Sequence, residues 1–138
     1  MGDWYEIGIT LGIGVAAGIA FAGVLAGLRF GFAITLLGAL VVSVPAGLLV
    51  NGWIGAGGGV VGAMIGAASA AAIVRGAKLR GATLGGTAFL LLGAAVVVGL
   101  LALIPTVGYF EAIVLPVVAV RRARGGPEKY AGLRSLAK

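Results

Sequence analysis

Hydrophobic residues in this chain form long unbroken runs, and polar residues gather in short patches between the runs. A bilayer core requires roughly 20 apolar residues of helix, at ~1.5 Å per residue. The runs have about this length and lack the alternation of a membrane strand, so they predict transmembrane helices. The predicted spans are residues 7–28, 30–50, 54–74, 82–104 and a shorter fifth at 106–120.

Short polar signals separate the runs. Arg29 ends the first run, Asn51-Gly52-Trp53 is a turn signal after the second, and Pro105 ends the fourth. We therefore expect an all-α integral membrane protein, a small glycine-rich bundle of about five transmembrane helices. Residues 1–120 would form the bundle and residues 121–138 a basic tail.

The fifth run is shorter than the others. Residues 106–120 give roughly 22 Å of helix, against a bilayer core of ~30 Å. We expect a short, untilted span in a locally thinned bilayer. The alternative is a re-entrant hairpin, which would leave the most basic stretch of the chain outside the cell, against the positive-inside rule.

The distribution of charge predicts the orientation of the bundle. Five crossings place Arg29, the basic patch at 75–80 and the basic tail on one side of the membrane. The positive-inside rule then puts the tail in the cytoplasm and the N-terminus outside. Aromatic side chains favour the membrane interface, and four of them fall on the outer side. These residues are Trp4, Tyr5, Trp53 and Tyr109.

The composition excludes most soluble and catalytic classes. The chain is 61% hydrophobic, only 10% of its residues are charged, and its mean hydropathy is +1.19, which is far from the composition of a soluble domain. It contains no cysteine, no histidine and only four acidic residues. These side chains supply most nucleophiles, general bases and metal ligands, so we expect no enzyme, no cofactor and no metal site. Abundant Ala, Gly, Val and Arg favours a bacterial cytoplasmic membrane.

The net charge of +6 does not indicate nucleic-acid binding, because the basic residues flank apolar runs. Such residues typically face anionic lipid of the inner leaflet. The tail from residue 121 to 138 is expected to form a short amphipathic helix on that leaflet, or a docking segment for a cytoplasmic partner. The expected anionic-lipid contacts are Arg75, Lys78, Arg80, Arg121, Arg122 and Arg124.

Glycines recur at four-residue spacing in the first and third runs, where they mark glycine-zipper faces. This spacing keeps small residues on one helix face and lets two backbones approach closely. The faces would pack helices within one chain or join subunits of an oligomer. The glycines concerned are Gly14, Gly18, Gly55, Gly58, Gly59, Gly62 and Gly66.

Glu111 is the acidic residue inside an apolar run, and ionisable residues in a membrane span are candidates for function. In one interpretation a helix begins near Val107, and the carboxylate lies in its first turns at the outer interface. In the other, Glu111 lines a wet cavity or pore and binds a proton or a cation.

The sequence predicts two classes of function. The first is an oligomeric channel or transporter for an ion or a small solute. The alternative is a non-catalytic structural or accessory subunit that packs into a larger membrane complex through its glycine faces. Both imply a lipid bilayer and other membrane chains as partners, and neither involves nucleic acid.

Overall fold

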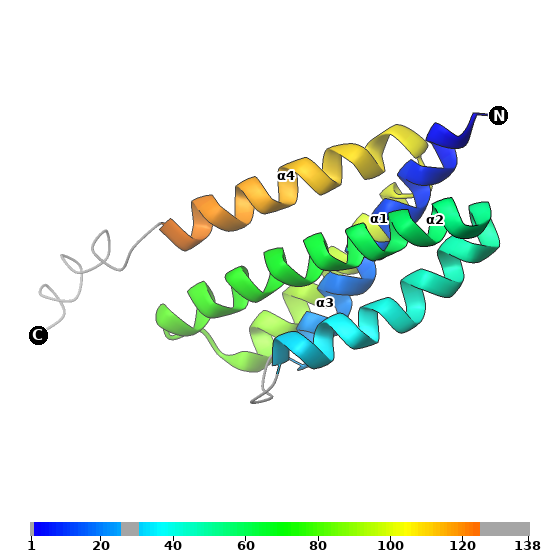
Figure 1. The fold of residues 1–138 in the computed structure, drawn as a ribbon. Coiled ribbons are helices and arrows are strands. Elements are labelled where there is room, and N and C mark those ends of the chain that lie inside the picture. Colours follow the sequence, from blue (N-terminus) through cyan, green and yellow to red (C-terminus); the bar gives the residue numbers. More distant parts are fainter. Residues whose placement is uncertain (1, 26–30, 125–138) are drawn as a thin grey trace, which may run out of the picture.

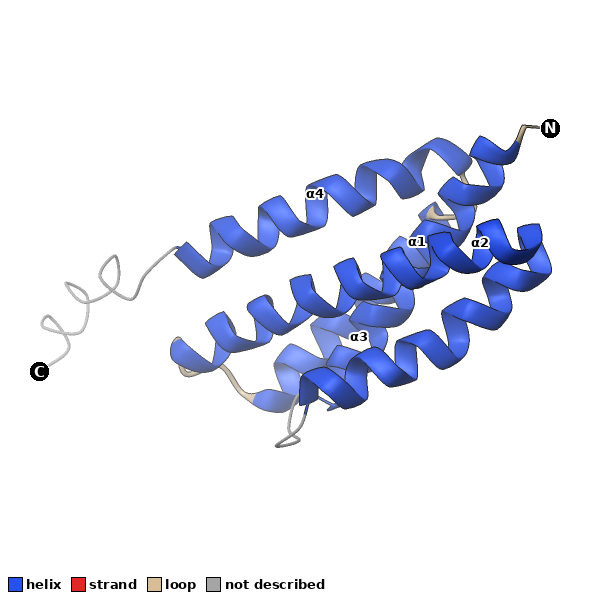
Figure 2. Ribbon diagram, in the orientation of Figure 1, coloured by secondary structure: helices blue, strands red, loops and turns tan. Residues whose placement is uncertain are grey.

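The computed structural model describes residues 2–25 and 31–124, and every regular element in these ranges is a helix (Figure 2). The prediction of an all-helical chain is confirmed. Arg29 and the predicted tail helix beyond Arg124 lie outside the described residues. The helices are α1 (Asp3–Leu25), α2 (Gly31–Leu79), α3 (Leu84–Leu101) and α4 (Pro105–Arg124).

α2 reverses direction in its middle. Asn51 has φ −147° and ψ 42°, and Gly52 has φ 51° and ψ −138°, so neither continues the helix. A positive φ is readily adopted only by glycine, which is why the reversal occurs at Gly52. It divides α2 into a first arm, residues 31–50, and a second arm, residues 53–79, which run side by side in opposite directions (Figure 1).

The two arms of α2 pack backbone to backbone. A Cβ atom built on Gly59 would lie 2.5 Å from the carbonyl oxygen of Ser43, and one built on Gly47 would overlap the carbonyl of Gly55. The turn signal in the sequence therefore marks a tight helical hairpin. The described part of the chain thus contains five helical segments.

Local signals also define the end of α2 and the start of α3. Gly81 has φ 76°, and the N–H groups of Gly81 and Ala82 donate to the carbonyls of Lys78 and Ala77, both at 3.0 Å. This is the Schellman pattern that ends many helices. Thr83 caps α3 by accepting a hydrogen bond from the Gly86 N–H at 3.3 Å.

α4 is longer than the predicted fifth span. It contains 20 residues, about 30 Å of helix, because the helix continues through the arginines that follow Val120. Basic side chains in a last turn interact favourably with the helix dipole. α4 shows no reversal, so the re-entrant hairpin is not formed.

α1 lies in the middle of the bundle. It contacts α2, α3 and α4, whereas α3 barely touches α2 and α4. Val15 is fully buried on it and Ile19 nearly so. The other helices surround α1 (Figure 1), and the core is built on its sides. The main cluster contains Val15, Ile19, Ala22, Ala70, Val74, Leu91, Ala95 and Val98.

Large apolar side chains cover the outside of the bundle, among them Leu49, Phe89 and Leu90. α1, α2 and α3 are each long and apolar enough to cross a membrane. An exposed apolar surface of this extent is unfavourable in water and suits lipid. The fold is therefore compatible with a membrane protein.

Candidate functional site

Glu111 lies in the second turn of α4, past the first turn in which it would cap the helix. The side chain is only 8% exposed, and both carboxylate oxygens are buried without a hydrogen-bond partner among the described residues. A Cβ atom built on Gly12 of α1 would lie 3.1 Å from Oε2 of Glu111. The carboxyl group is therefore enclosed against the backbone of α1.

Glycines allow this close approach of α4 to α1. A Cβ atom on Gly108 would overlap the carbonyl of Gly8, so the two backbones are in contact there. One turn further along α1, a Cβ on Gly12 would lie 2.5 Å from the Cβ of Ala102, in the connection between α3 and α4. Any larger residue at Gly12 would push α4 outwards and change the surroundings of Glu111.

The other buried polar groups do not extend the site. Thr10 donates to the carbonyl of Ile7 at 3.0 Å and faces Gly58 on the second arm of α2. Ser43 Oγ is also buried without a partner among the described residues, but it packs on Gly59 in the α2 hairpin. Glu111 packs on the side of α1 that α4 covers, so it stands apart from both hydroxyls.

Polar contacts hold α4 near both of its ends. At one end, the Tyr109 hydroxyl donates to the carbonyl of Trp4 at 2.8 Å. At the other end, Nη1 of Arg80 donates to the carbonyl of Arg122 at 3.3 Å. Between these contacts Pro116 removes one backbone hydrogen bond of the helix. An apolar groove of about 340 Å³ separates this half of α4 from the second arm of α2.

A second hollow lies at the N-terminal end of the bundle, beside the start of α4. It has a volume of about 250 Å³ and is lined by Trp4, Tyr5, Thr106 and Tyr109. Thr106 and Tyr109 precede Glu111 on the same helix by no more than about one and a half turns. Both residues are therefore nearer than Glu111 to the N-terminal end of the bundle, and they lie on a different side of α4.

The predicted packing glycines all lie against other helical segments of the same chain. Gly14 and Gly18 face the backbone of the second arm of α2 around Ala63 and Ala67. The second arm of α2 has one stripe of glycines that faces α1 and another that faces the first arm of α2. The stripe towards α1 is Gly58, Gly62 and Gly66, and the stripe towards the first arm is Gly55 and Gly59.

The described cations lie at the opposite end of the bundle from the N-terminus (Figure 1). Arg75, Lys78 and Arg80 end the second arm of α2, next to the last turn of α4. Asp3 and Glu6 lie in the first turn of α1, at the N-terminal end. The described charges are thus separated along the bundle axis. The cations at the end of α4 are Arg121, Arg122 and Arg124.

Sequence reasoning placed Gly8 and Gly12 on one stripe of the first helix, but it missed Gly108 and the contact of this stripe with the helix of Glu111. Gly108 precedes Glu111 by three residues and therefore shares its helix face. A glycine one turn before a carboxylate in an apolar run could have indicated that the carboxylate is covered, because the glycine permits a neighbouring backbone to pack on that helix face.

In residues 2–25 and 31–124 there is no group of three acidic, histidine or cysteine side chains that could hold a metal ion. Comparison of the chain with protein-family models, curated proteins and solved structures gives no match.

Proposed function

We propose that this chain is a small polytopic inner-membrane protein that moves a proton or a small cation across the membrane, with Glu111 as the group that binds it. The observation that supports this most is the burial of both carboxylate oxygens without a donor in the described part of the chain. A carboxyl group in a low-dielectric interior is costly to keep ionised and alone, so it favours a bound proton or cation.

The proposed path follows the contact between α1 and α4 and does not pass through the middle of the bundle, which α1 fills. From the outside, an ion would enter at the N-terminal end of the bundle and reach Glu111 along the contact between α1 and α4. It would leave along the groove between α4 and the second arm of α2. That groove is apolar in a single chain, so we propose an oligomer in which another copy completes the path.

The proposed orientation places the N-terminus outside and the basic end in the cytoplasm, with five crossings. The five helical segments and the separation of the described charges support it. Exposed aromatic rings at Trp4 and Trp53 would lie in the outer interface.

Labelling of single cysteines tests this orientation, since the natural chain has none. In intact cells a membrane-impermeant thiol reagent should label Thr106→Cys, near the start of α4. It should label Ala82→Cys, between α2 and α3, only after the membrane is permeabilised. The reverse pattern would overturn the orientation, and labelling of both in intact cells would overturn the five crossings.

Flux through proteoliposomes tests the role of Glu111. We expect the purified chain to pass protons, sodium or potassium, and Glu111→Gln to reduce that flux at least about tenfold. Glu6→Gln removes an acid at the end of α1 and should leave the flux unchanged. Full flux in Glu111→Gln would contradict the assignment.

The alternative proposal is a non-catalytic accessory subunit of a larger membrane complex. The observation that favours it is the position of α1, which leaves the middle of the bundle without a passage. Under this proposal the wild-type chain alone shows no flux for any tested ion. Glu111 would then be a group that a partner chain completes.

A further inference from the structure

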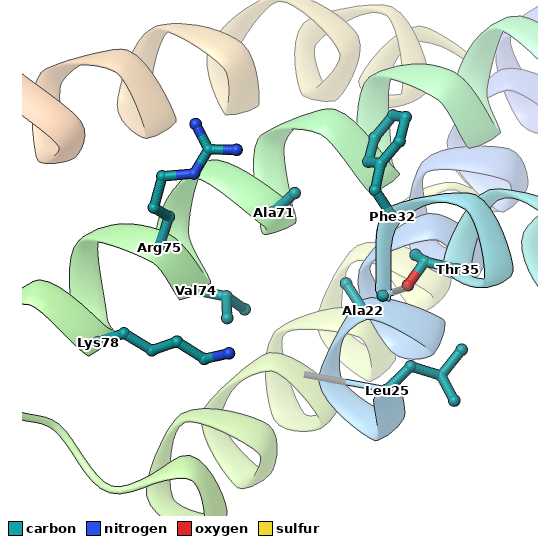
Figure 3. A pocket seen from close by; sticks show the side chains of 9 residues that line it. Ala22, Leu25, Phe32, Thr35, Ala71, Val74, Arg75 and Lys78 are labelled. Atoms are coloured by element: carbon teal, nitrogen blue, oxygen red, sulfur yellow. The ribbon is translucent and has the colours of Figure 1, made fainter. Parts of the chain in front are cut away.

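A pocket opens at the basic end of the bundle, between the end of α1 and the two arms of α2 (Figure 3). Its volume is about 230 Å³. The pocket lies away from Glu111, which is close to the opposite end. Ala22, Phe32 and Ala71 contribute apolar walls, and Thr35, Arg75 and Lys78 contribute the polar groups.

Two cations stand at the rim of this pocket. Arg75 and Lys78 are three residues apart on the second arm of α2, so they share a helix face. The side chain of Lys78 extends towards the end of α1 near Leu25, whereas that of Arg75 extends away from Lys78 (Figure 3). The described acids lie elsewhere, since Asp3 and Glu6 are at the other end and Glu111 is packed on Gly12. The rim therefore favours an anion.

The interior of the pocket differs from its rim. The walls are methyl groups and an aromatic ring, which a small hydrated anion does not need. Thr35, only 3% exposed, brings one hydroxyl to the pocket from a position one turn inside α2. From the rim inwards, positive charge thus gives way to apolar walls that contain a single hydroxyl.

This order matches the order of groups in an anionic phospholipid. The phosphate lies at the level of interfacial lysine and arginine, the ester carbonyls lie deeper, and the acyl chains follow. We propose that the pocket binds one anionic phospholipid from the leaflet at the basic end of the bundle. Lys78 binds its phosphate, and the exposed Arg75 side chain turns towards the pocket to join it. Thr35 donates to an ester carbonyl, and the alanine wall holds the start of an acyl chain. The proposal does not depend on transport.

Native mass spectrometry of the purified full chain tests this site. Phosphatidylglycerol and phosphatidylcholine with identical acyl chains serve as the two probes. The wild type should retain one phosphatidylglycerol and should bind phosphatidylcholine clearly less. The double variant Arg75→Gln/Lys78→Gln should bind phosphatidylglycerol about 30-fold more weakly, through the loss of two interfacial cations.

A matched control removes two cations from the same end of the bundle but outside the pocket. Arg121→Gln/Arg122→Gln should leave the retained phosphatidylglycerol nearly unchanged. Equal loss in the two double variants would overturn the pocket and leave a diffuse basic surface. Equal retention of both lipids by the wild type would overturn its preference for an anion.

Two further experiments test whether the site binds a whole lipid rather than its headgroup, and whether the apolar part of the pocket is needed besides its charge. Glycerol phosphate at millimolar concentration should not displace the bound lipid, because it lacks an acyl chain. Ala71→Leu keeps every charge but fills the apolar part of the pocket, and it should reduce lipid retention at least about tenfold. Displacement by glycerol phosphate, or undiminished retention by Ala71→Leu with an unchanged melting temperature, would contradict the proposal.

Discussion

α1 and α3 have similar compositions, but α1 is buried in the bundle and α3 is largely exposed on its outside. Both consist mainly of glycine, alanine and aliphatic residues, and both are long enough to cross a membrane. Half of the most apolar stretch of α1 is buried inside the bundle, against 17% of that of α3. Apolar composition therefore predicts that a helix enters the membrane, but not whether it faces protein or lipid.

The glycines explain the difference between the two helices. On α1, Gly14 and Gly18 face the second arm of α2, Gly12 faces the other way, towards Ala102 and Glu111, and each lies against another backbone. On α3, a Cβ atom on Gly85 or Gly93 would meet nothing within 4 Å. Close packing in lipid depends on small residues that face each other across an interface. The glycines of α1 have such partners, and these two on α3 do not.

Gly66→Leu should lower the stability of the fold more than any other substitution considered for these helices. A Cβ atom at Gly66 would overlap the backbone carbonyl of Val15, so a leucine there forces α1 and α2 apart. We expect a loss of about 4 kcal/mol or more, seen as a melting temperature at least about 10 °C lower in detergent. The matched control Gly93→Leu places the same side chain on the open face of α3, and it should melt no lower than the wild type.

Equal destabilisation by Gly66→Leu and Gly93→Leu would remove the distinction between the two helices. It would mean that the face of α3 at Gly93 is covered as closely as the centre of the bundle, for instance by another copy of the chain.

Gly12→Ala should have an intermediate effect. The added methyl group would lie 2.5 Å from the Cβ of Ala102 and 3.1 Å from Oε2 of Glu111, and neither neighbour can turn away without moving its backbone or the buried carboxyl group. We expect a loss of about 2 kcal/mol on thermal unfolding. If Glu111 binds the transported ion, the flux through proteoliposomes should fall as well. An unchanged melting temperature would show that α4 is not held against α1 at this point.

Gly99→Ala should have the smallest effect, and the opposite sign. A Cβ atom at Gly99 of α3 would lie 3.6 Å from that of Ala16, an ordinary contact between the two helices. The substitution adds this contact and removes the flexibility of glycine, so a gain of about 0.5–1 kcal/mol is expected. Thermal unfolding beside the wild type measures it. A loss of stability would show that α3 packs on α1 more tightly than its position indicates.

The sequence predicted the helices well because the signals for them are local. The turn at Asn51-Gly52 follows from a polar residue and a glycine with positive φ. Helix ends were less well predicted, since α1 begins at Asp3, ahead of the apolar run, and α4 continues into its arginines. Charged residues at helix ends keep the backbone hydrogen bonds and extend their side chains towards water.

The position of α1 and the surroundings of Glu111 were not predictable from one sequence. Each predicted helix is apolar on all sides, so no face indicates which neighbour covers it. The contact of Glu111 with Gly12 joins residues far apart in the chain, and it depends on how Gly8 and Gly108 bring two backbones together. The four-residue spacing of Gly8 and Gly12 marks a face of α1, but it does not indicate that Gly108 packs on that face.

If the chain spans a membrane as proposed, the central position of α1 also sets the order in which the protein is assembled during synthesis. α1 is made before every helix that covers it, and its glycine faces find their partners only when Gly66, Leu91 and Glu111 have emerged in turn. Until then they offer backbone surface to any other helix in the membrane. The newly made helix must therefore be protected from wrong partners, by lipid or by the insertion machinery, until α4 has been completed.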